Sequence, residues 1–163
     1  MDRVSDNFFA EMLLKQLGAR IRGSGTTAAG ARVVRSELRQ RGVNMTGVRI
    51  ADGSGLSRYD RLTARAIGQL LISAVSDTAI SSAFVASFPI AGVNGTLKDR
   101  MTTLPAYRHV FAKTGTTNRA SVLSGYVTTR YVFAILQNGN PIPWWYARAA
   151  QDRFAQVLAG RAT

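Results

Sequence analysis

Two short motifs, far apart in the sequence, carry residue types that together could perform acyl transfer. The triplet at 5–7 is Ser-Asp-Asn at the start of a helical pattern, and the triplet at 113–115 is Lys-Thr-Gly at the end of an extended one. A lysine beside a serine hydroxyl gives a proton a path to a leaving amine and places positive charge at the reacting centre. Threonine hydroxyls beside that lysine can hold a carboxylate, and a glycine at a strand edge lets a peptide lie alongside. The asparagine amide can orient both the catalytic side chains and a substrate amide.

The two motifs differ in how much information they carry. At residue frequencies of about 5%, a Lys-Thr-Gly triplet arises by chance in roughly 2% of chains this long, whereas Ser-x-Asn arises in roughly 40%. Each residue also has a structural alternative. Ser5 can be a helix N-cap, Lys113 a strand lysine with a solvated amine, and Gly115 part of a bulge or turn. The motifs alone leave both interpretations open.

The composition excludes several other chemistries. The chain of 163 residues has no cysteine and one histidine. A cysteine nucleophile and a thiolate metal site are therefore excluded, and a histidine-based zinc site or a Ser-His-Asp triad is disfavoured. No apolar run approaches the ~20 residues that span a bilayer, and no apolar segment of a signal peptide follows residues 1–4. For His109 we expect a structural or solvent-exposed role rather than a catalytic one.

The charge is strongly positive and comes mainly from arginine. There are 21 Lys and Arg residues against 9 Asp and Glu, a formal net charge of +12, and only three of the cations are lysines. Arginine side chains that are simply solvated at the surface would account for this positive charge without any functional role. Attraction to a polyanion such as nucleic acid, anionic lipid or an acidic cell-wall polymer is the alternative. No basic run is dense enough to indicate a nucleic-acid-binding tail.

The elements that position these motifs are helices first and strands later. Apolar spacing and capping residues predict helices at 5–17, 28–41, 62–75, 81–88 and 145–158. The first has Phe9, Met12, Leu13 and Leu17 on its apolar face, with Gly18 near its end. Alternation predicts a short strand at 43–51 and consecutive strands at 110–114, 121–129 and 131–137, the last two antiparallel. Helices followed by a strand meander and a closing helix indicate an α+β fold.

Aromatic residues of the second half are expected to serve this fold. We expect Tyr126, Tyr131 and Phe133 to lie in the core or in cross-strand contacts. The aromatic run at 144–146 is predicted to anchor the closing helix on the sheet, with a sugar-stacking platform as the alternative.

Four segments then form one signature, in order along the chain. They are SDNFFAEMLLK at 5–15, ADGSGLSR at 51–58, FPIAGVNGTL at 88–97 and AKTGT at 112–116. Together they resemble the C-terminal part of the DacB-like D-alanyl-D-alanine carboxypeptidase/endopeptidase family, the class C low-molecular-mass penicillin-binding proteins. The likeness covers nearly the whole chain, and DGSGLSR at 52–58 is its most distinctive part. It implies a partial fold of the penicillin-binding-protein and β-lactamase type, an antiparallel sheet flanked by helices.

The resemblance implies catalytic roles for three residues. Ser5 and Asn7 match the family's second catalytic motif, in which the serine hydroxyl takes part in proton transfer, and Lys113 matches the third.

It also implies a set of substrate-binding residues. Thr114 and Thr116 match hydroxyls that bind the terminal carboxylate of the substrate, with Gly115 between them, and the Thr116 N–H matches one of two oxyanion-hole donors. Arg58 matches a pocket arginine suited to a carboxylate of the peptidoglycan stem peptide, and Leu56 lines the same pocket. The alternative for Arg58 is one surface guanidinium among many.

The chain departs from the family pattern at the nucleophile. The family uses a Ser-x-x-Lys motif before the second motif, but the residues three positions before the lysines of this chain are Met12, Gly95 and Val110. The first strands of the family's five-stranded sheet are also missing. We therefore expect 1–163 to be the C-terminal portion of a single transpeptidase-like domain, and the isolated chain to be inactive.

The resemblance thus implies a serine-type D-Ala-D-Ala carboxypeptidase or endopeptidase that acts on peptidoglycan stem peptides through an acyl-enzyme. The complete enzyme would be inhibited by β-lactams, use no metal or cofactor, and work in the periplasm or otherwise outside the cytoplasmic membrane. This interpretation requires Ser5, Lys113 and Arg58 to converge on one cleft. Two alternatives remain: a non-catalytic remnant that binds acidic cell-wall polymer or peptide, and a basic nucleic-acid-binding module.

Overall fold

The computed structural model describes residues 2–128 and 130–162, and these form the predicted α+β fold. The chain divides into two compact units. The first comprises residues 6–73, and the second combines residues 2–5 with the chain from residue 74 onward. Each unit is described by itself. Within the described ranges, no helix is long and apolar enough to cross a membrane.

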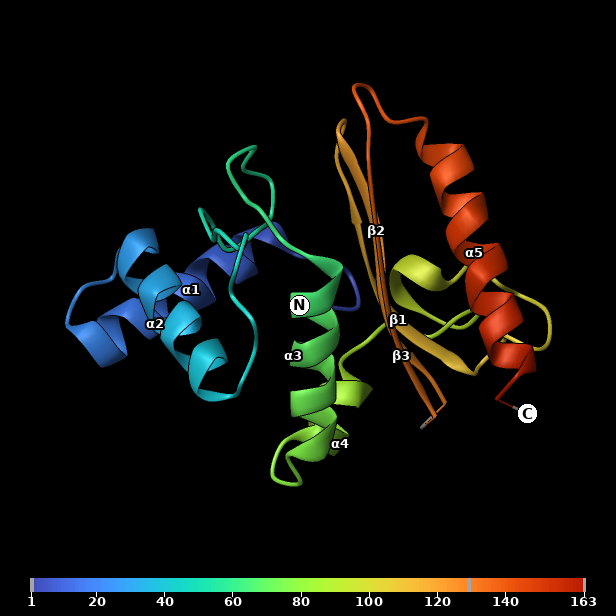
Figure 1. Ribbon diagram of the computed structural model, residues 1–163, viewed down its shortest axis with the longest axis horizontal. Coiled ribbons are helices and arrows are strands. Elements are labelled where there is room, and N and C mark those ends of the chain that lie inside the picture. Colours follow the sequence, from blue (N-terminus) through green and yellow to red (C-terminus); the bar gives the residue numbers. More distant parts are fainter. Residues whose placement is uncertain (1, 129, 163) are drawn as a thin grey trace. The chain divides into compact units, whose positions relative to one another are not determined.

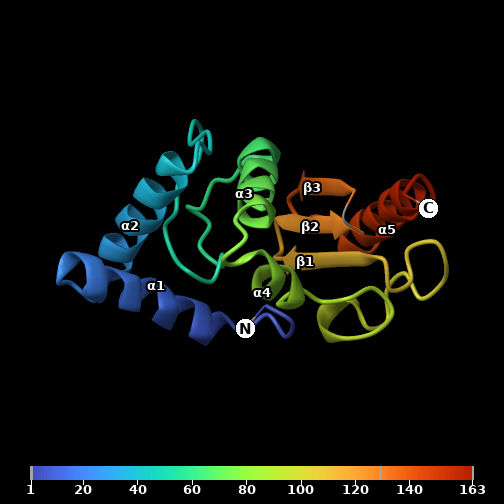
Figure 2. The ribbon, with the colours of Figure 1, turned by 90° about the horizontal axis from the view of Figure 1, so that it is seen from below.

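The first unit is built on two helices that approach backbone to backbone. Helices α1 (Asn7–Arg22) and α2 (Thr27–Gln40) lie side by side in Figures 1 and 2. A Cβ atom on Gly30 would overlap the carbonyl of Leu14, and one on Gly18 would lie 2.6 Å from the carbonyl oxygen of Ser24. Only glycine at these two positions allows the two helices to come so close.

Helix α1 is longer than predicted and packs through a different face. It continues through Gly18 and ends at Gly23, whose φ of 66° is left-handed. Leu14 is buried, whereas Phe9 and Leu13, two residues of the apolar spacing that predicted the helix, are 52% and 44% exposed. Contact with α2 runs along Leu14 and Gly18 instead.

The predicted strand at 43–51 was also wrong. This segment forms a single β-bridge, between Arg49 and Arg61. Its apolar side chains instead join helix α3 (Ala64–Ser76) in a small core cluster of Val43, Met45, Val48 and Ala66. Arg35 of α2 is partly buried and donates a 2.6 Å hydrogen bond to the Val48 carbonyl.

The second unit is a three-stranded antiparallel sheet covered by one long helix. Its strands, in the order β1-β2-β3, are β1 (Val110–Thr116), β2 (Ala120–Val127) and β3 (Tyr131–Asn138). All three strands were predicted, although Thr129, where the second was expected to end, lies outside the described residues. Helix α5 (Trp144–Gly160) packs along the sheet in Figures 1 and 2. The short helices α4 (Ser81–Ala86) and η1 (Gly95–Leu97) precede β1.

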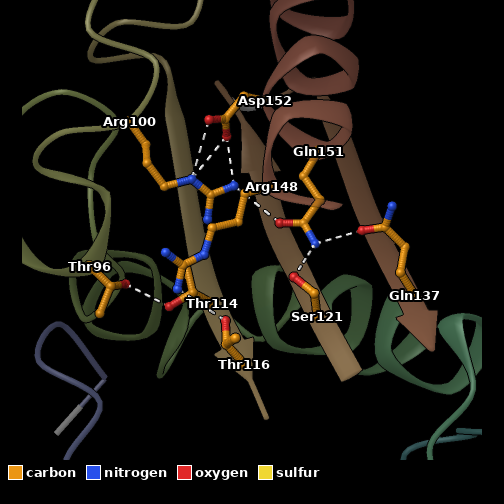
Figure 3. Close-up of polar contacts among 9 residues, drawn as sticks. All are labelled: Thr96, Arg100, Thr114, Thr116, Ser121, Gln137, Arg148, Gln151 and Asp152. Atoms are coloured by element: carbon orange, nitrogen blue, oxygen red, sulfur yellow. Dashed lines mark hydrogen bonds and ion pairs between the residues drawn. The ribbon is translucent and has the colours of Figure 1, made fainter. Parts of the chain in front are cut away.

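Small residues and one glutamine hold α5 on the sheet. Ala155 and Ala159 are buried against the sheet core. Buried Gln151 donates to Ser121 Oγ at 3.0 Å and to Gln137 Oε1 at 2.8 Å (Figure 3). A buried amide with its hydrogen bonds made fixes one register of the helix on the sheet.

The aromatic residues divide between core and surface. Tyr126 and Phe133 are buried, as predicted, and Tyr131 packs against the core cluster. The Tyr126 ring stands edge-on to Phe88 with centroids 5.7 Å apart, and burial raises the pKa of Tyr126 to about 12. Trp144 and Trp145 are about half exposed, so the prediction that they anchor α5 was wrong.

Replacing Gly30 with alanine is expected to destabilise the protein by about 1–3 kcal/mol, because the added methyl group overlaps the Leu14 backbone. The free energy of unfolding in urea measures this. Gly68→Ala is the matched control. A Cβ there meets nothing within 4 Å inside α3, so this change should stabilise by up to about 1 kcal/mol. Equal effects of the two substitutions would show that the α1–α2 contact is looser than described.

Candidate active site

Two of the three predicted catalytic side chains meet in the second unit. The Lys113 ammonium on β1 donates a 2.7 Å hydrogen bond to Ser5 Oγ and another of 2.7 Å to the Thr114 carbonyl. Ser5 and Lys113 are 108 positions apart in the sequence. The chain therefore places a serine hydroxyl directly against a lysine amine, the arrangement that proton transfer needs.

Residues 2–5 are held in place by the loop that precedes β1. The Thr96 N–H donates to the Arg3 carbonyl at 3.1 Å, and the Arg3 guanidinium donates to the Ala86 carbonyl at 2.6 Å. The Gly95 backbone lies so close to the Arg3 carbonyl that a Cβ would overlap it. Ser5 itself has a φ of 58°, in the left-handed region that non-glycine residues rarely adopt. These contacts aim the Ser5 side chain at β1.

The same loop covers only the first half of the outer edge of β1. The Ala112 N–H donates to the Pro89 carbonyl at 3.0 Å, so the Ala112 backbone faces the loop rather than β2. Because backbone groups alternate along an antiparallel strand, the N–H groups of Thr114 and Thr116 face this edge too. In the part of the chain that the structure describes, β1 pairs with β2 and, beyond it, only through the Ile90–Phe111 bridge. An extended peptide could pair with this second half of the edge.

Burial changes the acidity of the lysine. It lowers the pKa of the Lys113 ammonium, and the Asp2 carboxylate partly opposes the change. Asp2 is held by a 3.2 Å hydrogen bond from Ser87 Oγ. An amine with a lowered pKa releases its proton more readily at neutral pH, which suits it to exchange a proton with Ser5.

The predicted carboxylate-binding residues lie next along β1. Thr114 Oγ1 donates to Thr96 Oγ1 at 2.8 Å, while Thr116 Oγ1 accepts a long, 3.4 Å hydrogen bond from Arg148 of α5 (Figure 3). Gly115 between them is exposed. The Thr116 hydroxyl is thus the less firmly engaged of the two.

The other three predicted site residues belong to the first unit. Asn7 is the exposed first residue of α1, and Leu56 is 61% exposed. The exposed Arg58 guanidinium stacks 5.1 Å from the Tyr59 ring centre and donates to Tyr59 Oη at 3.0 Å. That Arg58 shares a cleft with Ser5 and Lys113 stays a prediction.

Asp52 organises the loop that carries Leu56 and Arg58. Its carboxylate accepts 2.7 Å hydrogen bonds from the N–H groups of Gly55 and Ser57. Gly55 has a φ of 75°, which explains a glycine at this position of the distinctive DGSGLSR block. Asp52 lies in the predicted glycine-rich block but was assigned no role, although an aspartate that begins a glycine-rich turn is a known signal for such a loop.

Glu11 attaches this loop to α1. Its carboxylate accepts 2.9 Å hydrogen bonds from the N–H groups of Gly53 and Ser54. A Cβ on Gly53 would lie 2.6 Å from the Ala10 carbonyl oxygen, so only glycine allows this approach. Glu11 was missed as a positioning residue because its partners are more than 40 residues away.

The Asp52 and Asp60 carboxyl groups interact with each other, and their pKa values shift in opposite directions. Burial alone would raise the pKa of Asp52, but its hydrogen bonds with Asp60, Gly55, Ser57 and Ser54 outweigh burial and lower it. Burial and the nearby Asp52 carboxylate raise the pKa of Asp60. At neutral pH the Asp52 charge therefore stabilises the loop and the Asp60 charge opposes folding.

His109 has a structural contact, in line with its expected role. Its Nδ1 lies 2.9 Å from the Pro105 carbonyl. Among the described residues, no group of three or more His, Cys, Asp or Glu side chains is placed to hold a metal ion.

The D-Ala-D-Ala carboxypeptidase 3 (S13) family matches residues 1–160. The chain belongs to this family. It is 40% identical to a D-alanyl-D-alanine carboxypeptidase of Actinomadura sp. (strain R39) and 32% identical to carboxypeptidase DacB of Mycolicibacterium smegmatis. These alignments cover 96% and 94% of the chain but 30% and 35% of the relatives, so the chain spans about a third of their length.

A solved structure shows the same fold. The chain resembles penicillin-binding protein 4 (dacB) from Haemophilus influenzae, complexed with a β-lactam, with a TM-score of 0.83 and 26% identity. The match covers 99% of the chain and 40% of that protein. The resemblance inferred from the four sequence segments is confirmed at the level of family and fold.

Lys113 is expected to titrate below the 10.5 of an ordinary lysine, because its ammonium is partly buried. NMR titration of the lysine side-chain ¹³Cε signals measures this, and Lys113→Arg identifies the signal by its loss. Asp2→Asn should lower the pKa of Lys113 further, since it removes the one nearby negative charge. A Lys113 signal that titrates at or above the ordinary value would contradict the buried position.

Asp52→Asn is expected to destabilise the protein by about 1–3 kcal/mol at neutral pH, because charge-assisted hydrogen bonds to the loop are lost. A carboxylate with a lowered pKa stabilises above its ordinary pKa of 3.8, and this contribution disappears as the pH falls below it. The cost should therefore shrink in acid. Asp60→Asn is the matched control and should be neutral or stabilising at pH 7, since the pKa of Asp60 is raised. Denaturant unfolding at pH 7 and pH 3.5 measures both, and similar losses for both variants at pH 7 would be inconsistent with this assignment.

Proposed function

We propose that this chain supplies the second and third catalytic motifs of a serine-type D-Ala-D-Ala carboxypeptidase or endopeptidase that acts on peptidoglycan stem peptides. The observation that carries the proposal is the 2.7 Å contact between Lys113 Nζ and Ser5 Oγ. Membership of the carboxypeptidase family and a relative complexed with a β-lactam support it.

The reaction divides between this chain and a nucleophile that its sequence does not contain. A serine hydroxyl of a Ser-x-x-Lys motif attacks the penultimate D-Ala carbonyl, the C–N bond to the terminal D-Ala breaks, and water then hydrolyses the acyl ester. Ser5 and Lys113 pass a proton to the leaving amine, while Asn7 orients the substrate amide. The Thr116 N–H donates to the oxyanion as it forms.

The remaining predicted residues select the substrate. The hydroxyls of Thr114 and Thr116 bind its terminal carboxylate, and Gly115 leaves room for its backbone along β1. Arg58 and Leu56 bind the side chain of the stem peptide. Peptidoglycan lies outside the cytoplasmic membrane, so the complete enzyme works there. The reaction uses no cofactor. β-Lactams acylate the same nucleophile in place of the substrate.

A second candidate is a non-catalytic segment that binds peptide or acidic cell-wall polymer through Arg58 and the β1 edge. The second half of the outer edge of β1, which pairs with no other strand in the described part of the chain, favours it. This alternative requires ligand affinity without any acylation in a complete domain.

Labelling with a fluorescent penicillin tests the first candidate. The isolated chain should take no covalent label, since it has no Ser-x-x-Lys. A chimera in which the chain replaces the aligned segment of the Actinomadura carboxypeptidase should be labelled. In that chimera, Ser5→Ala and Lys113→Ala should each slow labelling by about 100-fold or more, as expected for loss of a general acid or base.

Lys98→Ala is the matched control in the chimera, because Lys98 is an exposed lysine outside the site. It should label at the parental rate. Covalent labelling of the isolated chain would refute the inference that this chain lacks the nucleophile. A folded chimera that binds stem peptide but takes no label would favour the non-catalytic alternative.

A further inference from the structure

A pocket of about 530 Å³ lies at the C-terminal end of β1, within the second unit. Its walls come from the last residue of β1 and the turn after it (residues 116–118), the segment before α5 (residues 141–143) and the first turns of α5. Of the predicted site residues it contains only Thr116. The side chains of Trp144, Trp145 and Arg148 form its α5 side.

The Arg148 guanidinium in this pocket has no ion-pair partner among residues 2–128 and 130–162. Asp152, one turn further along α5, is engaged by Arg100 at 2.6 Å (Figure 3). The Arg148 Nε is buried and lacks a hydrogen-bond partner, and the side chain's contact with Thr116 Oγ1 is long, at 3.4 Å. A partly buried cation with an unused donor is costly unless an anion meets it.

The tryptophans give the pocket an apolar wall beside that cation. The Arg148 guanidinium lies 4.6 Å from the ring centre of Trp144, and Trp145 packs edge-on against Trp144 with ring centroids 5.7 Å apart. Trp144 is 47% exposed, so part of its surface remains open to a ligand. Stacking holds the guanidinium in one orientation. Its terminal N–H groups, one of which makes only the long contact with Thr116, can then meet a planar, bidentate acceptor.

We propose that Arg148 and Thr116 together bind the terminal α-carboxylate of an acylated peptide in this pocket, with Trp144 covering the adjacent carbon atoms. This inference rests on the proposed function, in which Thr116 contacts that carboxylate, and adds Arg148 as its cationic partner. Thr114 is less suited to the same role because its hydroxyl is already bonded to Thr96. Arg148 lies on α5, outside both sequence motifs, and acts in recognition rather than in proton transfer.

NMR of the ¹⁵N-labelled chain tests this directly, with N-acetyl-D-Ala-D-Ala and its C-terminal amide as probes. The free acid should shift the Arg148 Nε–H and the Trp144 indole N–H signals saturably, and the amide should not at equal concentration. Arg148→Gln should weaken binding of the acid by at least about tenfold, as expected for the loss of a charged hydrogen bond. Arg153→Gln is the matched control, since Arg153 is an exposed arginine of the same helix.

The result is separable from that of penicillin labelling, because binding of the acid needs no nucleophile. If the acid moves the Arg148 signal but the chimera takes no label, the proposed catalysis fails and the carboxylate site stands. Equal shifts with acid and amide, no shift with either, or unchanged affinity in Arg148→Gln would overturn the inference. If Arg148→Gln does not fold, Arg148→Lys is the second variant. It keeps the charge but loses the planar pair of guanidinium N–H donors, so it should still bind the acid more weakly than the wild type.

Discussion

The site depends on one backbone contact, the hydrogen bond from the Thr96 N–H to the Arg3 carbonyl. It fixes residues 2–5 against the loop before β1, and the adjacent hydrogen bond from Ala112 to Pro89 fixes that loop to the strand. Ser5 therefore reaches Lys113 through main-chain geometry rather than through a flexible side-chain contact. Backbone hydrogen bonds of this kind give the precise placement that proton transfer requires.

The positive charge of the chain has several separate causes. Arg100 pairs with Asp152, Arg41 pairs with Glu37, and Arg35 caps a buried carbonyl, so these arginines serve the fold. Lys113 and Arg148 belong to the site and its pocket; both are partly buried, and no ion pair to either is found within the described chain. Lys113 lies on β1, and Arg148 lines the pocket at the C-terminal end of that strand. The proposed peptide would lie along this part of β1. These five cations therefore have roles within the fold and the site that involve no polyanion.

Much of the fold was accessible from the sequence, and the failures have physical reasons. Strong periodicity predicted the helices and the meander, and the Lys-Thr-Gly motif lies on the first strand of that meander, as predicted. The apolar spacing of α1 predicted the helix but not its contact with α2, because Gly18 and Gly30 decide where the two helices come closest. The segment at 43–51 alternates like a strand, but among the described residues it forms only the isolated bridge between Arg49 and Arg61. Glu11 and Arg148 could not be identified, since their partners are distant in the sequence and no local motif marks them.

A double-mutant cycle between Ser5 and Lys113 tests most directly whether the chain itself brings these two groups together. The free energy of unfolding is measured for Ser5→Ala, Lys113→Met and the double variant. A hydrogen bond between the side chains predicts a coupling energy of about 0.5–1.5 kcal/mol. Additivity of the two substitutions would mean that the serine and the amine do not touch in solution, and the assignment of the active site would then be wrong.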